Sequence, residues 1–166
     1  MTGMKHTLIY LTAAFCLFLH PLHATSASEG NGPMTEVLES HKEAKILDGT
    51  KFKIAKPFIR KTPMGVIIDE ISMMIICPLD KEDFSLPKDI RRVLSQYIQV
   101  REIDDERSAM TIYIDEPQND RFSEILLYNT RPDPSIMLFV GDFTVESLIK
   151  VGEASEQERQ HLRKNK

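Results

Sequence analysis

The sequence predicts an α+β fold, with an antiparallel sheet of four or five strands and helices packed on one face. Three observations carry this prediction. Residues 73–77 are a continuous apolar run closed by a proline, which is typical of a strand buried on both faces. Over 86–96, apolar residues recur at i, i+3, i+4 and i+7, which predicts an amphipathic helix. From 97 to 141 the apolar period changes to two, which indicates four strands in a meander.

Length and composition place the chain among ordinary globular proteins. It has 166 residues, of which 42% are hydrophobic and 28% are charged. These values favour one domain with its own core and disfavour a disordered or fibrous chain. The formal net charge is -4, so the chain as a whole has no electrostatic attraction to nucleic acid.

The first 24 residues predict a secretory signal peptide. Lys5 precedes a short apolar run over 8–19, and Pro21 then leads to a small residue, Ala24. The run is too short to span a bilayer, which needs about 20 apolar residues. We predict cleavage after Ala24, with Ala27 as the alternative, and a periplasmic or secreted mature protein with no transmembrane segment.

The two cysteines bear on anchoring and on disulfides. Cys16 lies inside the apolar run behind bulky Phe15, so a soluble exported protein is predicted over a lipoprotein. Cleavage leaves Cys77 alone, so the mature chain forms no internal disulfide and depends on its hydrophobic core.

The mature chain divides into three predicted parts: a flexible leader over 25–34, one α+β domain over 35–152 and a polar, frayed tail over 153–166. Thr35 is expected to cap a short first helix. The next helix is expected over 54–69, with Pro57 in its first turn and Pro63 as a kink or end.

The remaining elements follow from capping and turn residues. Ser85 is expected to cap the helix over 86–96, and Thr144 the last helix over 144–151. The polar segments 104–106, 117–120 and 131–134 separate the four strands of the meander. Its last strand, 136–140, is apolar on both sides and is therefore placed centrally, with Gly141 turning the chain toward the last helix.

No catalytic residue is predicted. A nucleophile needs a base beside it, and only His41 and His161 remain after export. His161 lies in the polar tail, whereas His41 lies on the apolar side of a helix and is interpreted as structural. Cys77 is flanked by apolar residues and is interpreted as an inert core thiol.

No cofactor or metal is predicted either. The sequence lacks the ligand motifs of zinc and calcium sites. Its turn carboxylates are interpreted as solvated turn ends, with weak calcium binding or an acid–base pair as the alternatives if two turns converge. They are Asp80, Asp83, Asp104, Asp105, Asp115, Glu116 and Asp120.

Two further segments are candidate binding sites. The segment 141–144 is a candidate phosphate loop, but Asp142 would repel a phosphate, so a turn before a capped helix is the better interpretation. A basic stretch is interpreted as a solvated helix face, with an acidic partner surface as the alternative. It comprises Lys45, Lys51, Lys53, Lys56, Arg60 and Lys61.

Four segments, 71–76, 97–100, 122–127 and 136–148, resemble in order and pattern a family of exported Bacteroidetes proteins classed as a domain of unknown function. The resemblance runs from about Thr35 to Gly152. It implies an α+β fold and a periplasmic or extracellular location, and it implies no reaction or catalytic residue. Many members resemble lipoproteins, but this chain lacks their cysteine placement.

The sequence therefore favours an exported, non-enzymatic envelope protein that binds a protein partner or takes part in signalling. One alternative is a small hydrolase or lyase that uses the turn carboxylates. Another is a carrier of a small apolar ligand. That second alternative is suggested by a set of methionines, namely Met64, Met73, Met74, Met110 and Met137.

Overall fold

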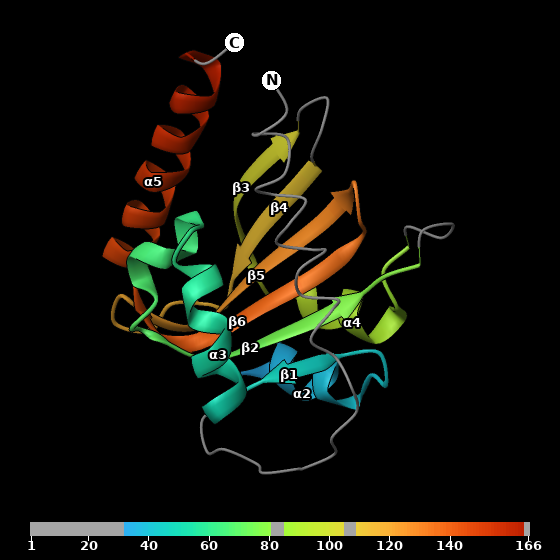
Figure 1. Ribbon diagram of the computed structural model, residues 1–166. Coiled ribbons are helices and arrows are strands. Elements are labelled where there is room, and N and C mark those ends of the chain that lie inside the picture. Colours follow the sequence, from blue (N-terminus) through green and yellow to red (C-terminus); the bar gives the residue numbers. More distant parts are fainter. Residues whose placement is uncertain (1–31, 81–84, 105–108, 165–166) are drawn as a thin grey trace. The chain divides into compact units, whose positions relative to one another are not determined.

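The described residues contain one antiparallel sheet whose strands follow the order β1-β2-β6-β5-β4-β3 (Figure 1). The computed structural model describes residues 32–80, 85–104 and 109–164, so the predicted signal peptide lies outside them. The α+β fold is confirmed, and β3 to β6 form the predicted meander. The strands are β1 (Lys45–Leu47), β2 (Ile71–Pro78), β3 (Ile98–Asp104), β4 (Ala109–Ile114), β5 (Arg121–Arg131) and β6 (Ser135–Thr144).

The sheet has six strands where four or five were expected. The additional strand is β1, three residues that pair with β2 through Lys45↔Ile76 and Leu47↔Met74. Strand β6 lies between β2 and β5, so the central position predicted for 136–140 is confirmed.

The predicted turn over 117–120 is also present. Asn119 and Asp120 both have positive φ, and Gln118 and Arg121 exchange backbone hydrogen bonds across it, as in a type I′ turn.

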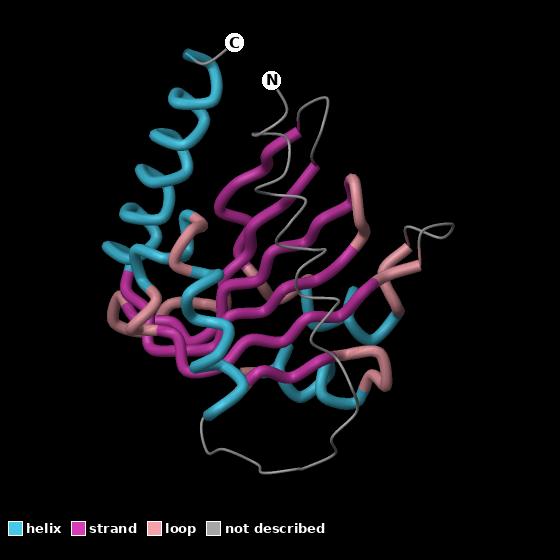
Figure 2. Tube along the Cα trace, viewed as in Figure 1, coloured by secondary structure: helices cyan, strands magenta, loops and turns pink. Residues whose placement is uncertain are grey.

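Helices connect and flank these strands (Figure 2). The expected helix over 54–69 is two elements, because the chain leaves the α-helix before Pro63 and begins a 3-10 turn there. The helix expected over 86–96 is shorter, and its N-cap is Pro87 instead of Ser85. The helical elements are α2 (Pro33–Ser40), α3 (Gly49–Ile59), η1 (Pro63–Ile67), α4 (Lys88–Leu94) and α5 (Val145–Lys164).

The helices cover both faces of the sheet, so the expectation that they pack on one face was wrong. On β2, Met73, Ile75 and Cys77 pack with α2 and α4 in one buried cluster. Side chains alternate along a strand, so buried Met74 points to the other face. That face is covered by α3 against β1 and β2, while α5 contacts β6 and η1 (Figure 1). We call these the α2–α4 face and the α3–α5 face.

Two predicted boundaries also need correction. The flexible leader expected over 25–34 overlaps α2, in which Met34 is fully buried. The polar segment expected to fray over 153–166 continues α5 as far as Lys164. Arg101 on β3 pairs with Glu156 on this helix, with 3.7 Å between Nη2 and Oε2. This contact connects the helix to the edge of the sheet. The polar sequence of 153–166 has no apolar periodicity that would predict a helix there.

Candidate functional site

A buried carboxylate, Glu124 of β5, lies at the N-terminus of α2. The Thr35 amide donates to its Oε1 over 2.9 Å, and the Met34 amide donates to its Oε2 over 3.3 Å. The Thr35 and Tyr97 hydroxyls also donate to this carboxylate. The helix has no side-chain cap of its own at Gly32, so a side chain from the sheet accepts the hydrogen bonds of its free amides.

The surroundings of Glu124 leave little room for a ligand. Glu124 is fully buried, and a Cβ added at Gly32 would lie 2.3 Å from its carboxyl carbon. Burial and the neighbouring carboxylate raise the pKa of Tyr97, which keeps the phenol protonated as a donor. The carboxylate is thus enclosed by its own donors, and its role is to fix α2 to the sheet.

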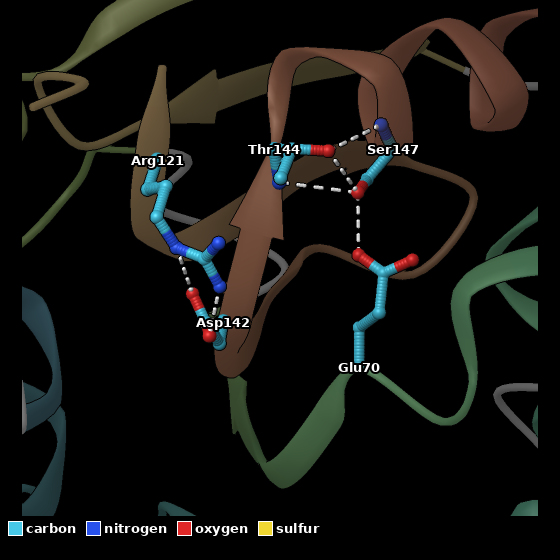
Figure 3. A network of polar contacts seen from close by, with 5 residues as sticks. All are labelled: Glu70, Arg121, Asp142, Thr144 and Ser147. Carbon is cyan, nitrogen blue, oxygen red and sulfur yellow. Dashed lines mark hydrogen bonds and ion pairs between the residues drawn. The ribbon is translucent and has the colours of Figure 1, made fainter. Parts of the chain in front are cut away.

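A second network surrounds the start of α5 (Figure 3). The Ser147 amide donates to Thr144 Oγ1 over 3.3 Å, and the Thr144 amide donates to Ser147 Oγ over 3.1 Å. This reciprocal pair is a capping box, and it agrees with the prediction that Thr144 caps the last helix. The Ser147 hydroxyl donates to Glu70, which connects the cap to the segment before β2.

Beside this network, Arg121 forms a two-point ion pair with Asp142 across β5 and β6 (Figure 3). Both side chains are more than half exposed, so water screens the pair and its contribution to stability is small. The residues of the candidate phosphate loop therefore serve strand pairing and capping. Gly141 is within β6, not at its end, because the strand continues to Thr144.

His41, Asp89 and Cys77 lie in the region where α2, α4 and β2 meet. His41 Nε2 is 2.9 Å from Asp89 Oδ2, which joins the end of α2 to α4. Burial and the nearby carboxylates of Glu43 and Asp89 raise the pKa of the Cys77 thiol to about 11. A thiol with a raised pKa is a poor nucleophile at neutral pH. This geometry supports the interpretation of Cys77 as a core residue.

Of the turn carboxylates that the structure describes, Asp115 and Asp104 form structural contacts through their side chains. Asp115 accepts hydrogen bonds from the Glu124 amide over 2.7 Å and from the Ser123 amide over 3.0 Å. Asp104 pairs with Arg131, and the backbone carbonyl of Asp120 accepts from the Val145 amide. Asp83 and Asp105 lie outside the described residues. Within the described ranges, no three His, Cys, Asp or Glu side chains gather in a way that would hold a metal ion.

The methionines are divided between the two faces of the sheet and do not line one site. Met73 belongs to the α2–α4 cluster, whereas Met74 points to the α3–α5 face. Met64 of η1 is buried, and Met110 and Met137 are half-buried. They fill gaps on either side of the sheet, as methionines commonly do. His161 is exposed on α5.

Of the seven large apolar side chains that are exposed among the described residues, five lie on the α3–α5 face and two lie on β3. Ile54 is 58% exposed and Phe58 38% on α3, and Val66 on η1 is 52% exposed. Val145 and Ile149 are exposed on the first turns of α5, which contacts η1. We call these five residues the apolar surface. The sequence analysis did not identify it, because apolar residues recur throughout 52–68 and their spacing does not separate buried from exposed positions.

Comparisons with protein-family models, with curated proteins and with solved structures give no match. Of the helices in the part of the chain that the structure describes, none is both long and apolar enough to cross a membrane.

Proposed function

We propose that this chain is an exported envelope protein that acts by binding a protein partner. The observation that carries the proposal is the apolar surface on α3, η1 and α5. Large apolar side chains that remain exposed together are typical of a surface that a second protein covers. The proposed location, periplasmic or secreted, rests on the signal peptide predicted over 1–24. The predicted resemblance to an exported family agrees with that location.

The polar networks support this proposal over carboxylate catalysis. Glu124, Asp115 and Glu70 each accept hydrogen bonds from groups that hold a helix end or a strand in place. A hydrolytic pair needs two carboxylates that face a common substrate position. These three carboxylates accept from internal donors, while the apolar surface faces outward.

The test is site-specific photocrosslinking in the cells that produce the protein. A photoreactive amino acid replaces Ile54 in the full chain, and in a matched control it replaces Lys88, which is exposed on α4 and belongs to the α2–α4 face. We expect one discrete adduct from position 54 and none of the same mass from position 88. Absence of any discrete adduct from positions 54, 66 and 149 would overturn the proposal.

A further inference from the structure

The apolar surface has a strongly cationic part. Residues 49–68, which comprise α3 and η1, contain five basic residues and no acidic one, although the whole chain has a net charge of -4. A charge excess confined to one segment of an acidic protein creates a local positive potential. This positive potential coincides with the exposed Ile54, Phe58 and Val66.

On α3, one exposed lysine and two exposed apolar side chains form a stripe that continues to Lys61. Lys51, Ile54 and Phe58 are exposed at spacings of three and four residues, and Lys61 follows three residues later in the turn after the helix. Residues three and four apart lie on one side of a helix. The neighbouring side carries Phe52, Ala55 and Ile59, which are buried, so the stripe lies along the border of the buried side. We call Lys51, Ile54, Phe58 and Lys61 the α3 stripe.

The cations of α3 differ in what they contact. Lys56 is engaged within the fold, since its Nζ lies 3.4 Å from Asp69 Oδ1 and 5.6 Å from the centre of the Phe52 ring. Lys51 and Lys61 form no ion pair with any described residue, and both are exposed. The stripe therefore presents two apolar side chains between two cations that are available to an outside carboxylate.

We propose that the α3 stripe binds an acidic protein segment, in which large apolar side chains lie between carboxylates. This inference rests on the proposed function and specifies the chemistry of the partner. Ten residues of helix extend about 15 Å, so two or three turns of a partner helix would match the stripe. Carboxylates of the partner would contact Lys51 and Lys61 at the two ends of the stripe, and these contacts would set the partner's orientation and association rate. Apolar side chains of the partner would cover the centre of the stripe.

The charges around the stripe favour a protein over an anionic membrane. Asp69, Asp142 and Glu146 are exposed on the segments next to η1 and at the start of α5. Each is paired with a cation of the fold, so these segments add little net positive charge, and a continuous anionic bilayer would be attracted at the lysines alone. A protein segment is narrow, and its charges can meet the lysines without meeting the carboxylates.

The experiment uses the crosslink from position 54 and changes the charge of the stripe. The crosslinked segment of the partner is sequenced by mass spectrometry, and the adduct yield is compared between the parent, a Lys51→Glu/Lys61→Glu variant and a Lys88→Glu/Arg92→Glu control. The control has the same net charge change, and both of its positions are exposed on α4. We expect an acidic segment, at least a tenfold loss of adduct in the stripe variant and no loss in the control. Thermal unfolding of both variants checks that each remains folded.

Several outcomes overturn the inference and leave the proposed function intact. In the first, the crosslinked segment of the partner is neutral or basic. In the second, the two double variants change the adduct yield by the same amount. A further measurement is flotation with vesicles of phosphatidylglycerol and phosphatidylcholine. If the parent floats with the vesicles and the stripe variant does not, the stripe binds lipid and the inference is overturned. Absence of any adduct would instead overturn the proposed function itself.

Discussion

The backbone amide of Thr35 donates a hydrogen bond of 2.9 Å to the carboxylate of Glu124, 89 residues later in the chain. The first turn of α2 is thus capped by the middle of β5. A helix of eight residues is marginal by itself, so its position depends on packing and on this contact. The α2–α4 face, which includes Met34 and Leu38 of the same helix, is assembled around it.

Glu124→Gln should destabilise the protein strongly. The amide nitrogen of Gln would face the donors of Met34, Thr35 or Tyr97, and a buried hydrogen bond would be lost. We expect a loss of about 2–4 kcal/mol in the free energy of unfolding, measured with urea. Glu36→Gln is the matched control, because Glu36 is an exposed carboxylate in the first turn of α2, beside Thr35. It should lower the free energy of unfolding by about 0.5 kcal/mol. Equal losses in the two variants would contradict the capping role.

The two central strands could be predicted from the sequence because burial on both faces selects apolar residues at every position. The runs over 73–77 and 136–140 lie within β2 and β6, side by side at the centre of the sheet. Both runs are apolar at every position, which by itself requires cover on both faces. The expectation of helices on one face conflicts with that requirement, and the structure resolves the conflict by placing α3 opposite α2 and α4.

The polar contacts could not be predicted in the same way, because their partners are distant in sequence. Glu124 interrupts an apolar strand, and its position two residues before buried Leu126 indicates that it points inward. Nothing local identifies Thr35 and Tyr97 as its donors. The α3 stripe could not be predicted for another reason: α3 carries apolar residues on both its buried and its exposed sides, so periodicity does not separate them.

Ser147→Ala should weaken the start of α5. The substitution removes the acceptor of the Thr144 amide and the hydroxyl that donates to Glu70, and Ser147 is almost fully buried. We expect a loss of about 1–2 kcal/mol in the free energy of unfolding. The control is Ser155→Ala in the same helix, whose hydroxyl only donates to the Val151 carbonyl one turn earlier. That change should be nearly neutral, and a comparable loss there would contradict the capping box.

Cys77 should make stability depend on pH at alkaline values. Burial raises its pKa in the folded protein to about 11, whereas the ordinary pKa of a cysteine thiol is 9.0, so between these values the unfolded state releases its proton first. Stability attributable to this residue is therefore present below about pH 9 and decreases as the pH rises toward 11. We expect Cys77→Ala to cost roughly 1 kcal/mol at pH 7 and the difference in Tm from the parent to narrow between pH 8 and pH 10.5.

The control for this measurement is labelling with a thiol reagent. The folded parent should resist the reagent at pH 8 and react only after denaturant is added, because Cys77 is buried. Rapid labelling of the folded protein, or a Tm difference that stays constant across the alkaline range, would show that the thiol is accessible.

Gly141 should tolerate no side chain, because the backbone of Glu70 passes directly over it. A Cβ at this position would lie 2.1 Å from the Glu70 carbonyl oxygen and 2.8 Å from the Phe143 ring. That carbonyl also accepts a hydrogen bond from the Asp142 amide, so it cannot move away without losing a partner. Gly141→Ala should cost about 1–3 kcal/mol, and Gly141→Val should cost more. Gly152→Ala in α5 is the control: its Cβ would meet only the Arg101 guanidinium, at 4.0 Å, and the change should stabilise the helix by about 0.5–1 kcal/mol. If Gly141→Val melts at the same temperature as the parent, Glu70 does not pack against β6 as described, and the connection from η1 into β2 must follow another path.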